Sequence, residues 1–338
     1  MRTVPYFVTL VAALAAVEIL LRLGIVSNLY YEHAHRARLD GAREAAQQKV
    51  LLLGDSFIDN VHCRNCVYQH LLRDLAPLDA AVLNAAESGM GPAEYLATLR
   101  AVAPRFRPDL VLLFYYVGND LTNVQYREAE GPGAGLKSRL KPFLDQFYLY
   151  HYLRQKWETF SRYTVNYEKV EKSGVPPEVV ALAKRGDLNH WYFRMSEAHP
   201  DYVKDNVLME TEENLRAWEK TRRILDEIDQ ATRALGARLA LVIFPHTTQV
   251  NRSHLDFFRN LRFNVDERLT GSTKPQDLLK EFCSERGLPC LDLLPAFRSA
   301  GGQEFYYESD EHFNARGNRF AENRVFRFLL EHGLVRKV

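Results

Sequence analysis

The sequence predicts an α/β domain of the three-layer, doubly wound kind, with about five parallel strands. Continuous apolar runs recur along the chain, and such runs are typical of parallel strands that are buried on both faces of a sheet. Amphipathic helical patterns lie between the runs, and this alternation places helices on both sides of the sheet. The chain has 338 residues, enough for one large domain or two small ones.

Five apolar runs are the expected strands. The first is KVLLLGDSF, residues 49–57, in which three leucines lead into Gly-Asp-Ser. Glycine, aspartate and serine are ordinary turn residues, but the carboxyl end of a strand is also where open α/β sheets keep their active sites. The other four runs lie at 79–89, 108–120, 237–246 and 288–297.

Five helices are expected between and after these strands. Pro92 marks the start of one helix, because proline is tolerated in the first turn, and Gly236 marks the end of another. The helical patterns cover 67–76, 92–103, 211–236, 275–287 and 314–333.

Residues 122–210 interrupt the alternation. This stretch is rich in Tyr, Phe, Trp, Lys and Arg and contains no convincing strand, so it is predicted to be a mostly helical insertion between the third and fourth strands. Its aromatic residues could line a substrate groove, or they could pack a lid with its own core, since aromatic side chains usually fill cores. The segment NHWYF, residues 189–193, could likewise contact sugar rings or form a packed aromatic cluster.

The amino terminus begins with an apolar run over 4–26, which includes two charges, Glu18 and Arg22. A bilayer core needs about 20 apolar residues in a helix, so a single membrane anchor over 1–26 is the preferred prediction. A cleaved signal peptide and a buried amphipathic helix are the alternatives. A polar, basic linker over 27–47 then leads to the α/β domain at 48–338.

Composition and charge exclude some functions. The chain is 46% hydrophobic and 26% charged with a net charge of +1, which is ordinary for a globular protein and does not favour a polyanionic partner. The sequence also has no nucleic-acid motif and no His, Asp or Glu spacing that suggests a metal site, so no nucleic-acid partner, cofactor or metal is expected. Two cysteine pairs, CRNC at 63–66 and CSERGLPC at 283–290, could form local disulfides or remain buried thiols. A redox pair at CRNC and a zinc site fit less well.

Four places could carry chemistry, and each lies at the end of an expected strand or just before the last helix. They contain Ser56, Gly89, Asn119, and the pair Asp310 and His312. A serine hydroxyl becomes a nucleophile when a base such as histidine takes its proton, and a carboxylate can orient that histidine. Backbone and amide N–H groups can then stabilise the oxyanion. Each place alone is a weak signal, but together and in this order they indicate a serine hydrolase.

These blocks resemble the SGNH, or GDSL-type, hydrolase superfamily, whose name comes from its Ser, Gly, Asn and His blocks. The resemblance covers about 48–332 and implies a flavodoxin-like fold. It implies catalysis by Ser56, His312 and Asp310, with oxyanion donors from Ser56, Gly89 and Asn119; Gly91 is a rival to Gly89. The matching segments are Gly54 to Phe57, Asn84 to Gly89, Gly118 to Asp120 and Asp310 to Gly317.

The last block departs from the common superfamily pattern and resembles the pattern of one branch. The common last block is Asp-x-x-His, whereas this chain has Ser309 three residues before His312 and Asp310 two before it. Asp310 is therefore the expected acid, with Glu308 as the fallback. The shorter spacing is similar to a membrane-anchored bacterial branch that is linked to polysaccharide O-acetylation.

That branch implies an esterase or acyltransferase that acts on O-acyl groups, most simply acetyl, of a carbohydrate or cell-envelope glycan. It also implies a single-pass inner-membrane protein with a periplasmic catalytic domain and a membrane-bound O-acyltransferase as partner. Arginines at 36, 38 and 43 favour the opposite orientation by the positive-inside rule, and the resemblance is preferred over them. A lipid esterase or thioesterase, or a non-catalytic assembly subunit, are the alternative functions.

Overall fold

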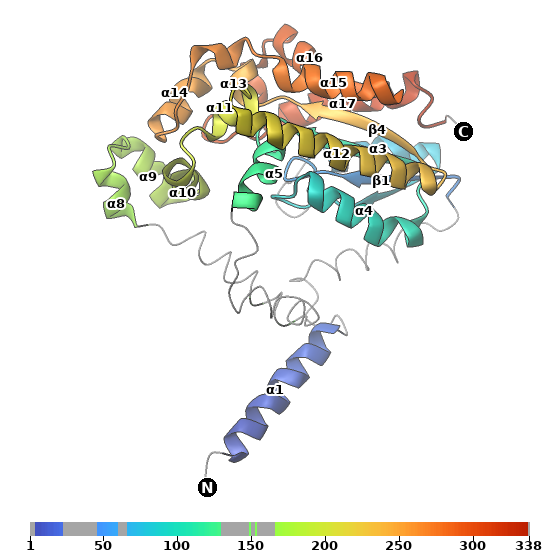
Figure 1. Cartoon of the computed structure of the whole chain (residues 1–338), viewed down its shortest axis with the longest axis horizontal. Coiled ribbons are helices and arrows are strands. Elements are labelled where there is room, and N and C mark those ends of the chain that lie inside the picture. Colours follow the sequence, from blue (N-terminus) through green and yellow to red (C-terminus); the bar gives the residue numbers. More distant parts are fainter. Residues whose placement is uncertain are drawn as a thin grey trace. The chain divides into compact units, whose positions relative to one another are not determined.

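The computed structural model describes residues 4–22, 46–59, 66–129, 149, 153 and 166–336. The chain divides into two compact units (Figure 1). The first comprises Met1–Gly41 and Glu130–Asn166, and the second comprises Ala42–Ala129 and Tyr167–Val338. Every residue of the candidate site belongs to the second unit.

The first unit contains helix α1 (Val4–Arg22), where the apolar run was expected to be helical. The Glu18 carboxylate accepts a hydrogen bond from the backbone N–H of Leu149, with an N–O distance of 2.8 Å. Within the described residues, no helix meets the length and hydrophobicity that a membrane crossing requires. The membrane anchor therefore stays a prediction, and most of the predicted linker at 27–47 lies outside the described residues.

The second unit is built on a five-stranded parallel sheet in the order β2-β1-β3-β4-β5. This is the flavodoxin-like order. Strand β2 is added on one side of β1, and β3, β4 and β5 are added on the other side, so the switch point lies between β1 and β3. The central strand β3 is buried along its whole length, as its unbroken apolar run predicts. The strands are β1 (Gln48–Leu53), β2 (Ala80–Asn84), β3 (Leu110–Tyr116), β4 (Arg238–Phe244) and β5 (Cys290–Asp292).

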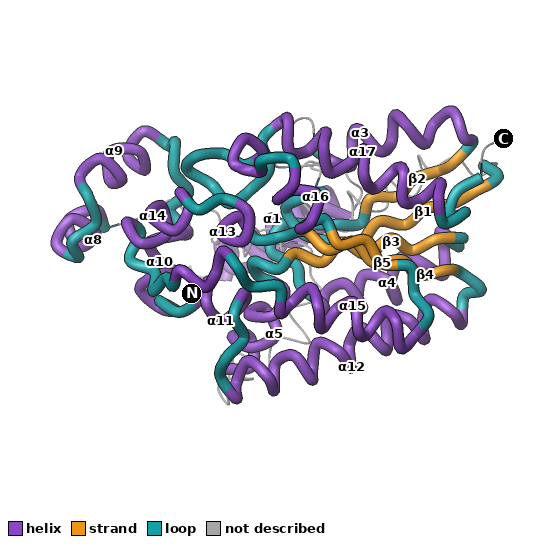
Figure 2. The backbone as a smooth tube through the Cα atoms, turned by 90° about the horizontal axis from the view of Figure 1, so that it is seen from above, coloured by secondary structure: helices purple, strands orange, loops and turns teal. Residues whose placement is uncertain are grey.

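Helices cover both faces of the sheet, which confirms the three-layer prediction. In Figure 2, one face carries α3 (Val67–Leu75) and α17 (Ala315–Glu331). The other face carries α4 (Pro92–Phe106), α12 (Glu212–Ala234) and α15 (Lys274–Arg286). All five helices lie close to their predicted positions.

The described part of the insertion is helical. It contains α5 (Asp120–Ala129), α8 (Tyr167–Lys172), α9 (Pro177–Arg185), α10 (Trp191–Ala198) and α11 (Tyr202–Val207). The stretches 130–148, 150–152 and 154–165 of the predicted insertion lie outside the described residues.

Several short elements were not predicted from the sequence. Helices α13 (Thr247–Val250) and α14 (Ser253–Asn260) follow β4, and α16 (Leu294–Ser299) follows β5. Within the described part of the unit there are also 3₁₀ turns at η2 (Ala76–Leu78), η3 (Glu267–Thr270) and η4 (Gly302–Phe305).

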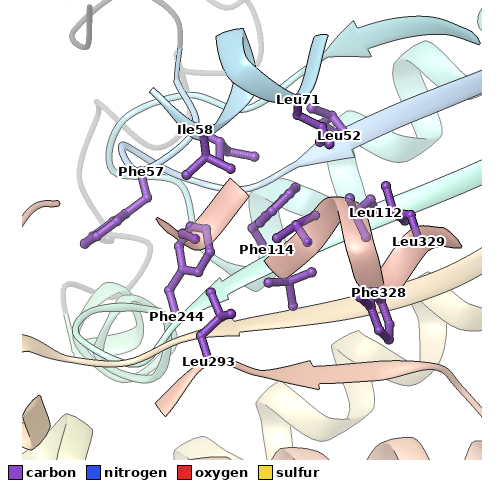
Figure 3. Close-up of a cluster of buried hydrophobic side chains, with 14 of the residues drawn as sticks. Leu52, Phe57, Ile58, Leu71, Leu112, Phe114, Phe244, Leu293, Phe328 and Leu329 are labelled. Atoms are coloured by element: carbon purple, nitrogen blue, oxygen red, sulfur yellow. The ribbon is translucent and has the colours of Figure 1, made fainter. Parts of the chain in front are cut away.

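The apolar core beneath α3 and α17 extends to the carboxyl edge of the sheet. Figure 3 shows this cluster, in which alternate side chains of β1, β3 and β4 meet residues of the two helices. Phe57, which follows Ser56, is 2% exposed and belongs to the same cluster. The turn that carries Ser56 is therefore anchored by core packing.

The two cysteine pairs differ from each other. Cys66 is disulfide-bonded, and Cys63 lies outside the described residues. Cys283 and Cys290 are free thiols, of which Cys283 is buried and Cys290 is half-buried, so the second pair forms no disulfide and matches the buried-thiol alternative only at Cys283. Hydrogen bonding with Cys290, together with burial, raises the pKa of the Cys283 thiol well above its ordinary value.

Candidate active site

Ser56 lies in a tight turn directly after β1. The backbone N–H of Asp59 donates to the carbonyl of Asp55 at 3.0 Å, and the N–H of Phe57 donates to Oδ1 of Asp55 at 3.1 Å. Gly54 is needed at the start of the turn, because a Cβ there would lie 2.8 Å from Cδ1 of Ile58 and 3.1 Å from Cβ of Phe114. The turn therefore presents Ser56 at the carboxyl end of the sheet, as the sequence predicts.

His312 and Asp310 lie in the loop between η4 and α17. An antiparallel bridge between Tyr306 and Phe313 closes this loop, and the N–H of Tyr307 donates to the carbonyl of His312 at 3.1 Å. The loop brings the imidazole to the serine turn, with Nε2 of His312 2.7 Å from Oγ of Ser56. On its other side, Nδ1 of His312 lies 2.6 Å from Oδ1 of Asp310.

These contacts fix the tautomer that the imidazole adopts when it is neutral. An ionised carboxylate can only accept hydrogen bonds, so Nδ1 of His312 carries the proton that points at Asp310. Nε2 is then the acceptor for the Ser56 hydroxyl. The three side chains form a continuous chain of hydrogen bonds in which the serine proton already points at a base. Glu308, the fallback acid, is exposed.

The electrostatics of the pair favour a charged imidazole. Burial by itself lowers the pKa of His312, but the charge and hydrogen bond of Asp310 outweigh burial, and the pKa rises to about 9. Burial raises the pKa of Asp310, yet the charge of His312 and the surrounding hydrogen bonds leave it below its ordinary value. The Phe57 ring stacks on His312, with ring centroids 4.8 Å apart. Asp310 is therefore placed to stabilise an imidazolium.

Asn119 lies just after β3 and faces the serine turn. Its side-chain amide donates to Oδ2 of Asp55 at 2.9 Å. The neighbouring Asp120 secures the loop, since its Oδ2 accepts the N–H of Tyr116 at 2.9 Å and its Oδ1 accepts the hydroxyl of Tyr95 at 2.8 Å. Burial raises the pKa of Asp55 to about 6, against the lowering effect of its hydrogen bonds. Asp55 thus orients Asn119 in addition to shaping the serine turn.

Gly89 lies in the loop after β2, with a positive φ of 80°. The loop is tied to the serine turn, because the N–H of Glu87 donates to the carbonyl of Gly54 at 3.3 Å. The rival Gly91 serves the next helix instead, since its N–H donates to the Glu94 carboxylate at 3.1 Å and caps α4. The N–H of Gly91 is thus part of the cap of α4, and Gly89 stays the predicted oxyanion donor.

His246, which follows β4, and the NHWYF segment have structural roles. His246 is fully buried and caps α13, where its side chain accepts from the N–H of Thr248. Its Nε2 faces Oε2 of Glu311 at 3.4 Å. Trp191 and Tyr192 of NHWYF pack against each other with centroids 5.3 Å apart, as expected for the packed-cluster alternative.

Sequence reasoning missed one contact of the site. The hydroxyl of Tyr192, from the insertion, donates to Oδ1 of Asp310 at 3.0 Å. The two residues are 118 positions apart, and no motif in the sequence connects them. Among the described residues, no group of three or more His, Cys, Asp or Glu side chains could hold a metal ion.

A comparison with protein families finds one match. Residues 188–336 match the family model described as an SGNH hydrolase-like domain, acetyltransferase AlgX. The match includes Asp310 and His312. Over these residues the chain is similar to an SGNH hydrolase-like domain. The predicted resemblance to this superfamily is thereby confirmed, although Ser56, Gly89 and Asn119 precede the matched residues of the SGNH hydrolase-like domain.

The solved structures that match this chain have low sequence identity to it and TM-scores below 0.5. An acetyl xylan esterase, AlAXEase, is 12% identical with a TM-score of 0.44, and the alignment covers 82% of this chain and 98% of the esterase. A lipase/acylhydrolase from Enterococcus faecalis is 16% identical with a TM-score of 0.43, covering 86% and 99% of the two chains. Likeness at this level bears on neither substrate nor reaction. No curated protein matches the chain.

Proposed function

We propose that this protein is a serine esterase or acyltransferase that forms an acyl intermediate on Ser56. The observation that carries the proposal is the chain of two short contacts, 2.7 Å from Ser56 Oγ to His312 Nε2 and 2.6 Å from His312 Nδ1 to Asp310 Oδ1. A hydroxyl, a base and an orienting carboxylate in this arrangement are what nucleophilic catalysis at an acyl group requires.

In the first half-reaction, Oγ of Ser56 attacks the ester carbonyl while its proton moves to Nε2 of His312. The new C–O bond converts the carbonyl oxygen to an oxyanion, and Asp310 stabilises the imidazolium. The tetrahedral intermediate then collapses, the bond to the leaving alcohol breaks, and His312 returns the proton to that alcohol. The acyl group remains on Ser56.

In the second half-reaction, an acceptor hydroxyl takes the place of the departed alcohol. His312 removes its proton as its oxygen attacks the acyl carbon, and the bond to Ser56 breaks as Oγ is reprotonated. Water as acceptor gives hydrolysis, whereas a sugar hydroxyl gives transfer. Both outcomes use the same residues, and the exclusion of water from the site would decide between them.

The oxyanion is assigned to three N–H donors: the backbone of Ser56, the backbone of Gly89 and the side-chain amide of Asn119. Asp55 supports this assignment, because it binds the Asn119 amide at 2.9 Å and so holds the second N–H of that amide in a fixed direction. Removing a single donor of this kind typically lowers kcat by about 10²–10³.

The proposed substrate is an O-acyl group, most simply acetyl, on a carbohydrate or cell-envelope glycan. The family description, which names an acetyltransferase, supports this choice for residues 188–336. We further propose that the amino-terminal apolar helix tethers the protein to the inner membrane, with the catalytic domain in the periplasm and a membrane-bound O-acyltransferase as partner. The disulfide at Cys66 supports an oxidising compartment.

The test is turnover of 4-nitrophenyl acetate by the full-length chain, followed by addition of acetylated and unacetylated oligosaccharides. We expect nitrophenol release that Ser56→Ala abolishes and that Ser299→Ala, a change at an exposed serine at the end of α16, retains. Acetylated oligosaccharide would identify a transferase, and free acetate alone would identify an esterase. Activity only on long-chain esters would replace the acetyl substrate with a lipid. Equal inactivity of wild type and Ser56→Ala on all of these esters would contradict the proposal and favour a non-catalytic role.

A further inference from the structure

Tyr192 lies at the start of α10 in the insertion, and it reaches the loop that carries Asp310 and His312. Its side chain is 2% exposed, so the phenol is shielded from water. The hydroxyl donates to Oδ1 of Asp310 at 3.0 Å and accepts from the backbone N–H of Glu311 at 3.1 Å. One phenol oxygen therefore contacts both the carboxylate and the backbone of the same loop.

The contact falls on the oxygen that holds the imidazole. Oδ1 of Asp310 accepts from Nδ1 of His312 at 2.6 Å, from the backbone N–H of His312 at 3.2 Å and from Tyr192 at 3.0 Å. Rotation of the carboxylate would move Oδ1 away from Nδ1 and would break the bond to Tyr192 at the same time. The phenol thus opposes the rotation that would release the imidazole.

The phenol is itself held by aromatic packing. The Tyr192 ring meets Phe257 edge-on, with centroids 5.5 Å apart and planes at 87°, and it meets Phe258 at 6.1 Å and 78°. Trp191 packs on it at 5.3 Å. Edge-to-face pairs of this kind fix the ring beyond what buried area alone provides.

The insertion also forms hydrogen bonds with the loop that carries Asp310 and with the loop that carries Asn119. The Ser309 hydroxyl donates to the carbonyl of Asp187 at 3.0 Å, next to the Asp310 loop. On the other side, the Asn206 amide donates to Oγ1 of Thr122 at 3.0 Å, and that hydroxyl donates to the carbonyl of Asn119 at 3.0 Å. The helices around Tyr192 are therefore part of the support of the site.

We propose that Tyr192 is a positioning residue for catalysis, and that the insertion holds the Asp310–His312 pair in its productive geometry through this phenol. The proposal rests on the proposed serine mechanism. The NHWYF segment would then position a catalytic carboxylate, a role that differs from both contact with sugar rings and core packing.

The first test compares Tyr192→Phe with Tyr306→Phe in the full-length chain. Both changes remove one buried phenol hydroxyl near the site, but Tyr306 donates to the carbonyl of Pro245 and not to Asp310. We expect Tyr192→Phe to lower the rate of acylation by 4-nitrophenyl acetate about tenfold with an unchanged KM, because a hydrogen bond to a charged group is lost. Tyr306→Phe is expected to stay within about twofold. Equal effects of the two variants would overturn the proposal.

The second test observes the hydrogen bond without using activity. The proton on Nδ1 of His312 should give a low-field proton NMR signal that Asp310→Asn abolishes. In Tyr192→Phe we expect this signal to shift and to exchange faster with water, while Tyr306→Phe leaves it unchanged. An unaltered signal in Tyr192→Phe, or no such signal in wild type, would overturn the proposal. A normal signal in a wild type that forms no acyl-enzyme would contradict only the serine mechanism.

Discussion

Oγ of Ser56 lies 2.7 Å from Nε2 of His312, although 256 positions separate the two residues in the sequence. The strand β1 ends at the serine turn, and the loop before α17 returns the histidine to the same edge of the sheet. The parallel topology explains this meeting, since the carboxyl ends of the strands share one edge. Asp310 orients the histidine of this pair, and Gly89 and Asn119 are the proposed oxyanion donors beside the serine.

The pH dependence of acylation follows from the pKa of His312. The base must be neutral to accept the serine proton, and its pKa is raised to about 9, so activity is expected to rise with pH up to about 9. Glu311→Gln removes a negative charge that contributes to the raised pKa, so its profile should move to lower pH. Burst kinetics with 4-nitrophenyl acetate across pH 5–10 measure both profiles. A wild-type midpoint near the ordinary histidine pKa of about 6.5 would contradict this prediction.

Asp55→Asn is expected to lower kcat roughly 10²-fold, the scale of a lost oxyanion donor. The substitution puts an NH2 group at one of the two oxygen positions. That donor then faces either the Asn119 amide, which donates to Oδ2 at 2.9 Å, or the N–H of Phe57, which donates to Oδ1 at 3.1 Å. Asn119→Ala is the matched variant and should show a loss of similar size with little change in KM. Steady-state kinetics measure both variants. A fully active Asp55→Asn would mean that Asp55 does not orient Asn119.

The free energy of unfolding is expected to depend on pH through Glu322, which lies on α17. Burial and the nearby Asp74 carboxylate raise its pKa to about 8 in the folded protein, from an ordinary value of 4.5. Because the folded state holds this proton more tightly, the associated stability is complete below about pH 4.5 and is lost as pH rises to about 8. Urea unfolding of Glu322→Gln should therefore show growing stabilisation over wild type across this window. A constant difference between the two proteins at all pH values would refute the assignment.

Gly118→Ala separates damage to the site from simple loss of stability. A Cβ at Gly118 would lie 2.3 Å from Cε1 and Cζ of the buried Tyr116 ring, so the loop that carries Asn119 must shift. We expect a loss of about 1–3 kcal/mol in unfolding free energy and at least a tenfold fall in kcat.

Gly186→Ala is the control for this change. Gly186 has a φ of 83° and open space around it, so alanine there costs about 1–2 kcal/mol through backbone strain alone. Its kcat should be unchanged. Equal loss of kcat in the two variants, measured beside their urea unfolding curves, would show that the Gly118 effect is only one of stability.

The sheet and the main helices were predictable because their patterns are local. The uninterrupted apolar run of β3 and the long amphipathic face of α12 each extend far enough for their periodicity to be read. Helices α13 and α14 escaped prediction because they have 4 and 8 residues. Stretches this short carry too few turns for a helical period, and a buried histidine cap such as His246 is not a recognised start signal.

The site was predictable where its residues lie in motifs and not where they meet through tertiary packing. Ser56 stood out because Gly-Asp-Ser follows an apolar run, and Asp310 and His312 stood out as a spaced pair. Their meeting came from the family resemblance, because nothing in spacing fixes a contact across 256 positions. Tyr192 could not be found in advance, since its contact with Asp310 depends on how α10 packs against Phe257.

The most direct test of the central claim is mass spectrometry of the full-length chain after rapid quenching from 4-nitrophenyl acetate. We predict one acetyl group per chain, located by peptide mapping on Ser56, absent from Ser56→Ala and present in Ser299→Ala. His312→Ala should acquire this group far more slowly. An acetyl group that maps to another residue, or that forms equally in Ser56→Ala, would contradict the proposed serine mechanism.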